Sequence, residues 1–99
     1  VILKKSRKEL PKIPFGELVE QGLIPAGAVL TDAKNKYRAK VNSDGSLKIK
    51  NISGSIHQVG AKIQGLPNCN GWDYWHLQNN NNSILIDNIR NDYRLKKLI

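Results

Sequence analysis

The alternation of apolar and polar residues divides the chain into short segments with different periods. Apolar residues at positions 15, 18 and 19 follow Pro14 and precede Gly22. Proline suits the first position of a helix and glycine the position just beyond its end, so this spacing predicts a two-turn helix over residues 15–21. The apolar run at residues 28–31 then predicts the first strand.

Between residues 34 and 50 the period becomes two, which predicts an antiparallel hairpin around a turn at residues 43–46. Alternation in this hairpin would bury Tyr37, Ala39, Val41, Leu47 and Ile49. The opposite face would carry six cations, Lys34, Lys36, Arg38, Lys40, Lys48 and Lys50, offset only by Asp44. A face of a single sign indicates a surface that contacts phosphates, and edge-strand lysines that block aggregation are an equally good explanation.

A second helix is expected to begin after Ser55. Ser55 and Gln58 form a capping-box pattern, in which each side chain satisfies a backbone N–H that the first turn leaves unpaired. Apolar residues recur at helical spacing over residues 56–63, and Gly65 followed by Pro67 provides a stop. The pattern predicts a helix of about three turns.

An aromatic cluster follows this helix. Asn70 and Gly71 accept the positive φ of a tight turn, and residues 72–77 are expected to continue from it as a strand. Strand alternation would separate Trp72 from Trp75, which predicts that at least one indole lies outside the core. An exposed indole beside an asparagine turn and a helix N-terminus indicates a ligand-contacting cluster. A half-buried aromatic strand is the simpler interpretation.

The end of the chain predicts a second hairpin and a last helix. Asparagines at residues 79–82 separate the aromatic strand from an apolar strand at residues 83–86. Asp87 can cap a final helix in which Ile89 and Tyr93 lie on one side. The sequence therefore predicts an α+β fold, a small single domain with the order α-β-β-β-α-β-β-α and an antiparallel sheet with short helices.

Composition limits the classes of protein to which the chain can belong. Its 99 residues suit one small domain. The single cysteine cannot form an internal disulfide, and the chain has neither a membrane-spanning apolar run nor a signal-peptide pattern. We therefore expect a cytoplasmic protein with no membrane partner. The start at Val1 and the absence of methionine suggest a piece of a longer polypeptide.

The formal net charge of +8 indicates a polyanionic partner. Much of the excess lies at the two ends of the chain. Residues 1–13 are rich in lysine and arginine and contain a proline, so we interpret them as a basic linker from a preceding domain, with residues 14–99 forming the domain itself. A solubilising tether is the alternative interpretation of the same segment.

Catalytic and metal-binding interpretations find little support. Cys69 with His57 or His76 could form a nucleophile and base or a zinc site, yet no C-x-x-C or H-x-x-x-H spacing occurs. No glycine-rich phosphate loop follows a predicted strand. We therefore expect no catalytic residue, no metal and no cofactor in this chain.

The segment from Gly54 to His76 carries a specific resemblance. It reads G-S-I-H-Q-V-G-A-K-I-Q-G-L-P-N-C-N-G-W-D-Y-W-H. This stretch resembles, without gaps, the signature of the RAMA domain, which is associated with restriction enzymes and adenine methylases. It is most similar to the version at the C-terminus of bacterial DNA adenine methyltransferases of the GANTC-recognising, cell-cycle-regulated type. The resemblance extends outward from Phe15 to the ending I-D-N-I-R-N-D-Y-R.

The resemblance implies a noncatalytic DNA-binding domain of a site-specific DNA adenine methyltransferase. In such proteins the G-S-I-H and C-N-G-W segments contact DNA, which implies that role for Ser55, His57, Asn70 and Trp72. A hydroxyl at a helix N-terminus can donate to a phosphate, an asparagine can read a base edge, and an indole can stack on an unpaired base. The cations Lys36, Arg38, Lys40, Lys48 and Lys50 would add phosphate contacts. Asn68 departs from the commoner S-C-N-G-W pattern and leaves the other positions intact.

The resemblance also implies partners outside this chain. Adenine methyltransferases hold the target amino group with a D-P-P-Y-like segment and S-adenosylmethionine with an F-x-G-x-G-like loop, and this chain contains neither. DNA and an N-terminal methyltransferase domain in cis are therefore the expected partners, with S-adenosylmethionine bound in that domain and a homodimer as one option for the parent. Two alternatives stay open: a reader or interaction module for methylated adenine or a protein, and an accessory DNA-binding domain of a restriction enzyme.

Overall fold

A computed structural model of the chain describes residues 12–79 and 81–98, so most of the expected basic linker lies outside the described residues. The elements in chain order are α1 (Phe15–Glu20), β1 (Val29–Thr31), β2 (Arg38–Val41), β3 (Leu47–Ile49), β4 (Ile52–Gly54), α2 (Ile56–Gln64), α3 (Gly71–Tyr74), β5 (His76–Asn79), β6 (Asn82–Leu85) and α4 (Ile86–Leu98). The predicted order of helices and strands is confirmed. The structure adds the strand β4 before α2 and the one-turn helix α3 after it.

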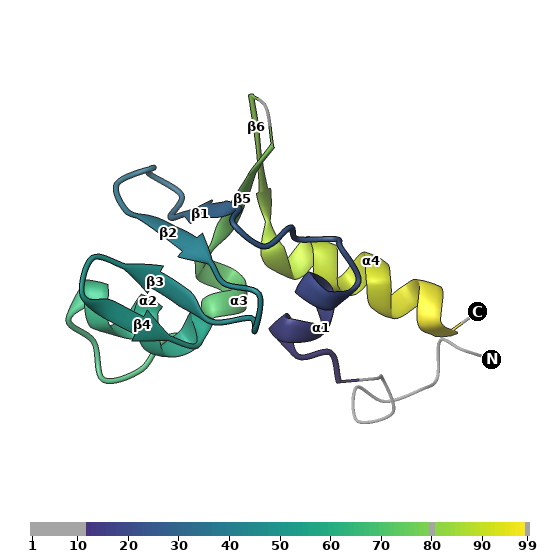
Figure 1. The fold of residues 1–99 in the computed structure, drawn as a ribbon, viewed down its shortest axis with the longest axis horizontal. Coiled ribbons are helices and arrows are strands. Elements are labelled where there is room, and N and C mark those ends of the chain that lie inside the picture. Colours follow the sequence, from purple (N-terminus) through teal and green to yellow (C-terminus); the bar gives the residue numbers. More distant parts are fainter. Residues whose placement is uncertain (1–11, 80, 99) are drawn as a thin grey trace.

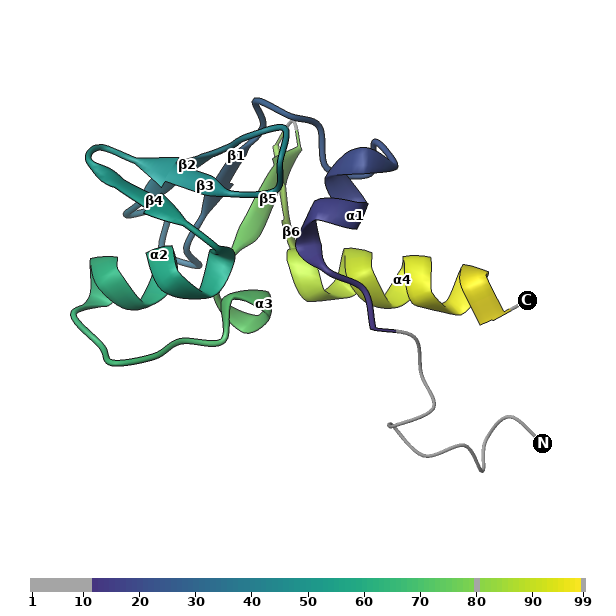
Figure 2. The same ribbon diagram turned by 60° about the horizontal axis from the view of Figure 1, so that its bottom comes forward.

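The strands form one antiparallel sheet in the order β4-β3-β2-β1-β5-β6 (Figure 1). Helix α2 lies against one face of the β2-β3-β4 part of this sheet, with α3 beside it (Figure 2). Helix α4 continues directly from β6 and runs alongside α1. The chain thus builds a sheet with helices at one face and at one end.

The core lies between the sheet and its helices. Alternation in β2 and β3 buries Ala39, Val41 and Leu47 completely, as predicted, whereas Tyr37 and Ile49 are half-buried. The core also contains Ile13, which precedes α1, and Ile56 and Val59 from α2. Each fully buried aliphatic side chain contributes about 1.5–3 kcal/mol relative to an exposed one, so this layer fixes α2 on the sheet.

Helix α2 begins with the predicted capping box. The N–H of Gln58 donates to Ser55 Oγ at 3.1 Å, and the N–H of Ser55 donates to Gln58 Oε1 at 3.0 Å. The helix ends at Gly65, whose φ of 70° is left-handed and costs glycine little. Local sequence chemistry therefore determines both ends of α2.

The prediction of a strand over residues 72–77 is wrong in its first half, where the chain forms α3. Asn70 has a φ of −88° rather than the positive φ of a tight turn, and its Oδ1 accepts the N–H of Trp72 at 3.2 Å as a helix N-cap. Trp72 and Trp75 lie three residues apart on a helical turn and both point inward, at 8% and 0% exposure. The prediction that one indole lies outside the core is therefore also wrong.

Helix α3 packs directly against the first turn of α2. The indole Nε1 of Trp75 donates to the carbonyl oxygen of Ile56 at 2.9 Å. A Cβ atom added at Gly71 would lie 2.7 Å from the carbonyl carbon and oxygen of Ile56, which is closer than such atoms can approach. Gly71 is thus required by the contact between two helices and not by a turn.

The alternating cations lie only partly in strands. Arg38, Lys40 and Lys48 are strand residues, whereas Lys34, Lys36 and Lys50 lie in turns, and all six are exposed. Asp32 causes the difference in the first hairpin. Its Oδ1 accepts the backbone N–H groups of Lys36 at 2.6 Å and Tyr37 at 2.9 Å, and this side-chain turn delays the start of β2 to Arg38.

Helix α4 begins at Ile86, one residue before the Asp87 that was predicted to cap it. Asp87 lies instead in the first turn, where it pairs with Arg90. Farther along, Glu17 joins α1 to α4, because its Oε2 accepts the hydroxyl of Tyr93 at 2.6 Å and the ammonium of Lys97 at 3.1 Å.

Replacement of Gly71 tests the contact between α2 and α3. Gly71→Ala should lower the free energy of unfolding by roughly 1–3 kcal/mol, because the new methyl group must displace the Ile56 carbonyl. Gly16→Ala is the matched control, since its Cβ would meet its nearest neighbour, the Asp44 carbonyl oxygen, at 3.4 Å within a helix that favours alanine. Urea unfolding measures both variants, and equal stabilities would contradict the packing argument.

The contact between α1 and α4 predicts a dependence of stability on pH. The Tyr93 hydrogen bond, followed by that of Lys97, lowers the pKa of Glu17 from its ordinary 4.5, and bonding to Glu17 raises the pKa values of Tyr93 and Lys97 from 10.0 and 10.5. A lowered acid pKa stabilises the fold above 4.5, and this stabilisation is lost as the pH falls through the folded-state pKa. The raised pKa values stabilise it below 10, and that part is lost as the pH rises through them.

Glu17→Gln should therefore lower the melting temperature most near neutral pH, with a smaller difference from the parent chain at both extremes. Glu20→Gln, on the exposed end of the same helix, is the control and should leave the profile unchanged. Thermal melts across the pH range measure the difference. If the difference in melting temperature between the parent and Glu17→Gln is the same at every pH, the carboxylate charge does not contribute to stability.

Candidate nucleic-acid interface

A groove of about 270 Å³ opens between the starts of α1 and α2 and the turn between β2 and β3. It is lined by Pro14, Phe15, Gly16, Gly45, Ser55, Ile56, His57 and Trp72, and we call it the Trp72 groove. Of the residues that the family resemblance assigned to DNA, Ser55, His57 and Trp72 thus share one surface. Asn70, the fourth, directly precedes α3.

The β2–β3 turn forms the far side of this groove. Asp44 Oδ1 accepts the N–H of Ser46 at 2.9 Å and its hydroxyl at 2.7 Å, and these bonds hold the pKa of Asp44 below its ordinary 3.8. Gly45 has a φ of 87°, and a Cβ there would lie 2.6 Å from Gly16 Cα. The turn can therefore sit against the first residues of α1 only because Gly45 has no side chain.

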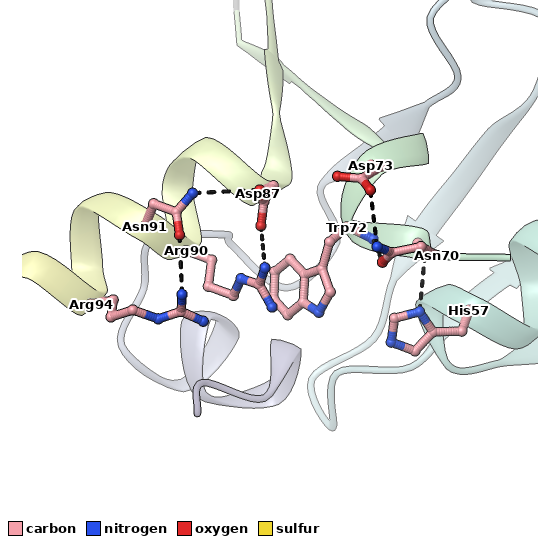
Figure 3. Close-up of polar contacts among 9 residues, drawn as sticks. His57, Asn70, Trp72, Asp73, Asp87, Arg90, Asn91 and Arg94 are labelled. Carbon is pink, nitrogen blue, oxygen red and sulfur yellow. Dashed lines mark hydrogen bonds and ion pairs between the residues drawn. The ribbon is translucent and has the colours of Figure 1, made fainter. Parts of the chain in front are cut away.

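His57 presents a defined face to the groove. Its Nδ1 accepts the N–H of Gly71 at 2.9 Å, a bond drawn in Figure 3. A neutral imidazole that accepts at Nδ1 carries its proton on Nε2, so the exposed ring offers an Nε2–H donor. The same bond satisfies an N–H at the start of α3 that the helix itself leaves unpaired.

Ser55 adds a second donor on the same wall. Its oxygen accepts the capping bond from Gln58, which leaves the hydroxyl hydrogen to turn toward a ligand. The residue is exposed and stands at the N-terminus of α2, where the backbone N–H groups favour an anion. Ser55 and His57 thus each offer a hydrogen-bond donor among the residues that line the groove.

Asn70 is exposed and also caps helix α3. Its Oδ1 caps α3, and its Nδ2 donates to Asp73 Oδ2 at 2.9 Å (Figure 3). One amide hydrogen and one lone pair of the oxygen remain after these two bonds. Asn70 can therefore read a base edge only while it also holds the first turn of α3.

Trp72 forms the inner wall of the groove. Phe15 meets the indole edge-on with 6.0 Å between ring centroids, and the guanidinium of Arg90 stacks over the ring at 4.2 Å (Figure 3). Asp87 pairs with that guanidinium and fixes its orientation. Such a cation–π contact stabilises by about 0.5–2 kcal/mol. Trp72 is thus mainly a packed residue, and its 8% exposure leaves only a small part of the ring to the groove.

Arg90 is a candidate site residue that the sequence alone does not single out. No motif links it to Trp72, and the available signal is its spacing of four residues from Arg94 on the last helix. Figure 3 shows Arg94 one turn farther along α4, where its Nη1 donates to Asn91 Oδ1 at 3.4 Å. The Nε atoms of both arginines are buried without a hydrogen-bond partner among the described residues. Their planar groups suit the recognition of phosphate.

The cations of the sheet form a separate surface. Ala39, Val41 and Leu47 face α2, so the alternate residues Arg38, Lys40 and Lys48 project from the other face of the sheet. Lys40 and Lys48 stand directly opposite each other, a pairing of like charges that costs stability. Neither ion pair recorded for residues 12–79 and 81–98 involves them. The fold therefore does not bring the predicted strand cations to the Trp72 groove.

The predicted turn cations lie elsewhere again. Lys36 stands in the turn between β1 and β2, with its ammonium 5.4 Å from the ring centroid of Tyr37. Lys50 stands in the turn between β3 and β4 with a φ of 53°. The six cations that looked equivalent in the sequence thus divide into a sheet face and two turns.

The described residues offer little support for a metal site or for thiol chemistry. No group of three His, Cys, Asp or Glu side chains gathers there as metal ligands would. Cys69 is half-buried, and its sulfur accepts a weak bond from Gln64 Nε2 at 3.4 Å. None of the helices described is both long enough and apolar enough to cross a bilayer.

Comparison with known proteins identifies the family of the chain. The chain is similar to the Type II methyltransferase M.HinfI of Haemophilus influenzae, with 37% identity over 83 residues. That match covers 84% of this chain and 23% of the methyltransferase, so the chain spans less than a quarter of that relative's length. A family model described as Restriction Enzyme Adenine Methylase Associated matches residues 4–98. The chain belongs to this family, RAMA.

Proposed function

We propose that the chain is a noncatalytic DNA-binding domain of a site-specific DNA adenine methyltransferase, where it adds affinity and helps to hold the strands around the target. The observation that carries the proposal is the Trp72 groove, in which Ser55 and His57 present donors beside an arginine-stacked indole. The similarity to a Type II methyltransferase and the name of the family support this setting.

The groove has the chemistry to hold one strand. The donors of Ser55 and His57 suit a phosphate oxygen at the N-terminus of α2. Arg90, held by Asp87, offers planar donors of fixed orientation to a neighbouring phosphate. Trp72 is only 8% exposed, so the small part of its indole that reaches the groove gives a sugar or the edge of an unpaired base an apolar contact. Base flipping by an adenine methyltransferase would supply such unpaired bases.

The sheet face contributes in a different way. Arg38, Lys40 and Lys48 form a patch of one sign in a chain of net charge +8, and their binding to phosphates would release counterions. Contacts of this kind position a protein on DNA without reading its sequence. We therefore assign affinity to the sheet face and selectivity to the Trp72 groove.

Methyl transfer belongs to another domain in this proposal. The chain has no D-P-P-Y-like segment for the target amino group and no F-x-G-x-G-like loop for S-adenosylmethionine. The cofactor would bind in a methyltransferase domain in cis, and this chain would supply DNA contacts to it.

Removal of the sheet charges should weaken DNA binding in general. A variant with Arg38→Ala, Lys40→Ala and Lys48→Ala should bind every duplex more weakly and lower the salt slope of log K by roughly one for each phosphate that the protein no longer neutralises. Lys62→Ala, an exposed charge on α2, is the control and should change the slope less. Fluorescence anisotropy of a labelled duplex at several salt concentrations measures the slope. An unchanged slope in the triple variant would remove the sheet face from the interface.

Replacement of Asn70 should weaken DNA binding by removing a direct contact to DNA rather than by changing the charge of the domain. Asn70→Ser keeps an oxygen to cap α3 and removes the amide donors, so binding should weaken by roughly 1–3 kcal/mol while the salt slope and the melting temperature stay close to the parent values. His57→Asn should behave similarly, because its amide oxygen can still accept the Gly71 N–H after the Nε2–H donor has gone.

Asn68→Ser is the matched control for this measurement, since Asn68 is exposed and lies outside the Trp72 groove. It should bind DNA as the parent does. If Asn70→Ser and His57→Asn both keep parental affinity in the same titrations, the groove does not contact DNA.

A further inference from the structure

A second and larger concavity, of about 470 Å³, lies between the β1–β2 turn, the end of α2 and α3. We call it the Asp32 pocket. Its volume falls in the range of pockets that enclose small organic groups. Asp73 and Tyr74 of α3 line it, whereas the preceding Trp72 lines the other groove, so α3 contributes to both concavities. The proposed DNA-binding function makes no use of this pocket.

The pocket contains an acidic group that the fold holds in place. Asp32 is only 8% exposed, and its Oδ1 already accepts the N–H groups of Lys36 and Tyr37. Neither ion pair of the described residues includes it. The second carboxylate oxygen, Oδ2, accepts none of the recorded bonds and can accept from a ligand that carries an N–H group.

Two tyrosines provide the aromatic surface. Tyr37 is half-buried in the β1–β2 turn, and Tyr74 packs edge-on against Trp75 with 4.9 Å between the ring centroids. Burial, followed by the nearby charge of Asp32, raises the pKa of Tyr74 to about 12. Its phenol therefore stays protonated at neutral pH and can donate to a ring nitrogen.

The floor and the rim differ in polarity. His76 lines the pocket, and its Nδ1 is buried without a partner among the described residues, which leaves one polar atom of the floor unsatisfied. Lys34, Lys36 and Asp73 line the same pocket and are exposed, so its exposed lining carries two cations and one carboxylate. The excess of positive charge there favours a ligand whose outer part is anionic.

We propose that the Asp32 pocket receives one unpaired nucleobase that carries an exocyclic amino group, with the adjoining phosphates on Lys34 and Lys36. This inference rests on the proposed DNA-binding function and extends it to a separate site. The base stacks on Tyr37 and its amino group donates to Asp32, while Tyr74 donates to a ring nitrogen. Adenine fits this pattern, whereas thymine has no exocyclic amino group and presents carbonyl oxygens to the carboxylate.

Duplexes with one bulged nucleotide test the pocket in the 99-residue chain. A duplex with an unpaired dA should bind about 5- to 150-fold more tightly than the same duplex with an unpaired dT, the range expected when one base is distinguished by its hydrogen bonds. Tyr74→Phe should reduce that preference. Tyr37→Ala removes a stacking surface that any base can use, so it should weaken the binding of both bulged duplexes. Both variants should leave the affinity for the fully paired duplex unchanged. Fluorescence anisotropy at one fixed salt concentration measures all three duplexes.

Tyr93→Phe is the matched control for Tyr74→Phe, because it removes a phenol bound to Glu17 outside the pocket. It should keep the full preference for dA. Melting temperatures of all variants check folding, and the paired duplex provides a second check because its binding does not involve the pocket.

If the parent chain binds the dA and dT bulges equally, the proposal for the pocket is overturned. If it still binds the paired duplex strongly in that case, the proposed DNA-binding function is unaffected. No binding of any duplex at low salt would overturn both. Saturable binding of a trimethyllysine peptide that Tyr37→Ala abolishes, without a preference among bulges, would overturn it in favour of a cation site.

Discussion

The contact between the first turn of α2 and the single turn of α3 is the constraint on which the rest of the structure depends. Three short-range features make it: the Trp75 indole bonded to the Ile56 carbonyl, the His57 ring bonded to the Gly71 N–H, and the missing side chain at Gly71. Each needs the backbones to be close, and together they orient α3. The walls of the Trp72 groove and of the Asp32 pocket both follow from that orientation.

The sequence predicts well those elements whose signals are local. The ends of α2 follow from Ser55, Gln58 and Gly65, whose side chain and backbone preferences act within one turn. It fails at α3, because Asn70-Gly71 suits a hairpin turn and an N-cap equally. The burial of Trp72 and Trp75 decides between them, and burial depends on α2 and α4, which are distant in the sequence.

The candidate site shows the same division. Ser55, His57 and Trp72 belong to one continuous segment, so a resemblance along the chain can bring them to attention. Arg90 enters only because α4 packs beside α3 and lays a guanidinium over the indole. The separation of the strand lysines from the groove is equally a property of the fold, since alternation shows which residues share a face but not what lies behind that face.

The opposed pair Lys40 and Lys48 gives salt two contrary effects on this domain. Dissolved ions screen the repulsion between the two ammonium groups and so make the sheet more stable. The same ions compete with the protein for a nucleic-acid backbone and so weaken its attachment. High salt should thus stabilise the free domain and at the same time weaken its binding to a nucleic acid. A bound polyanion would itself neutralise the two lysines in place of the dissolved ions.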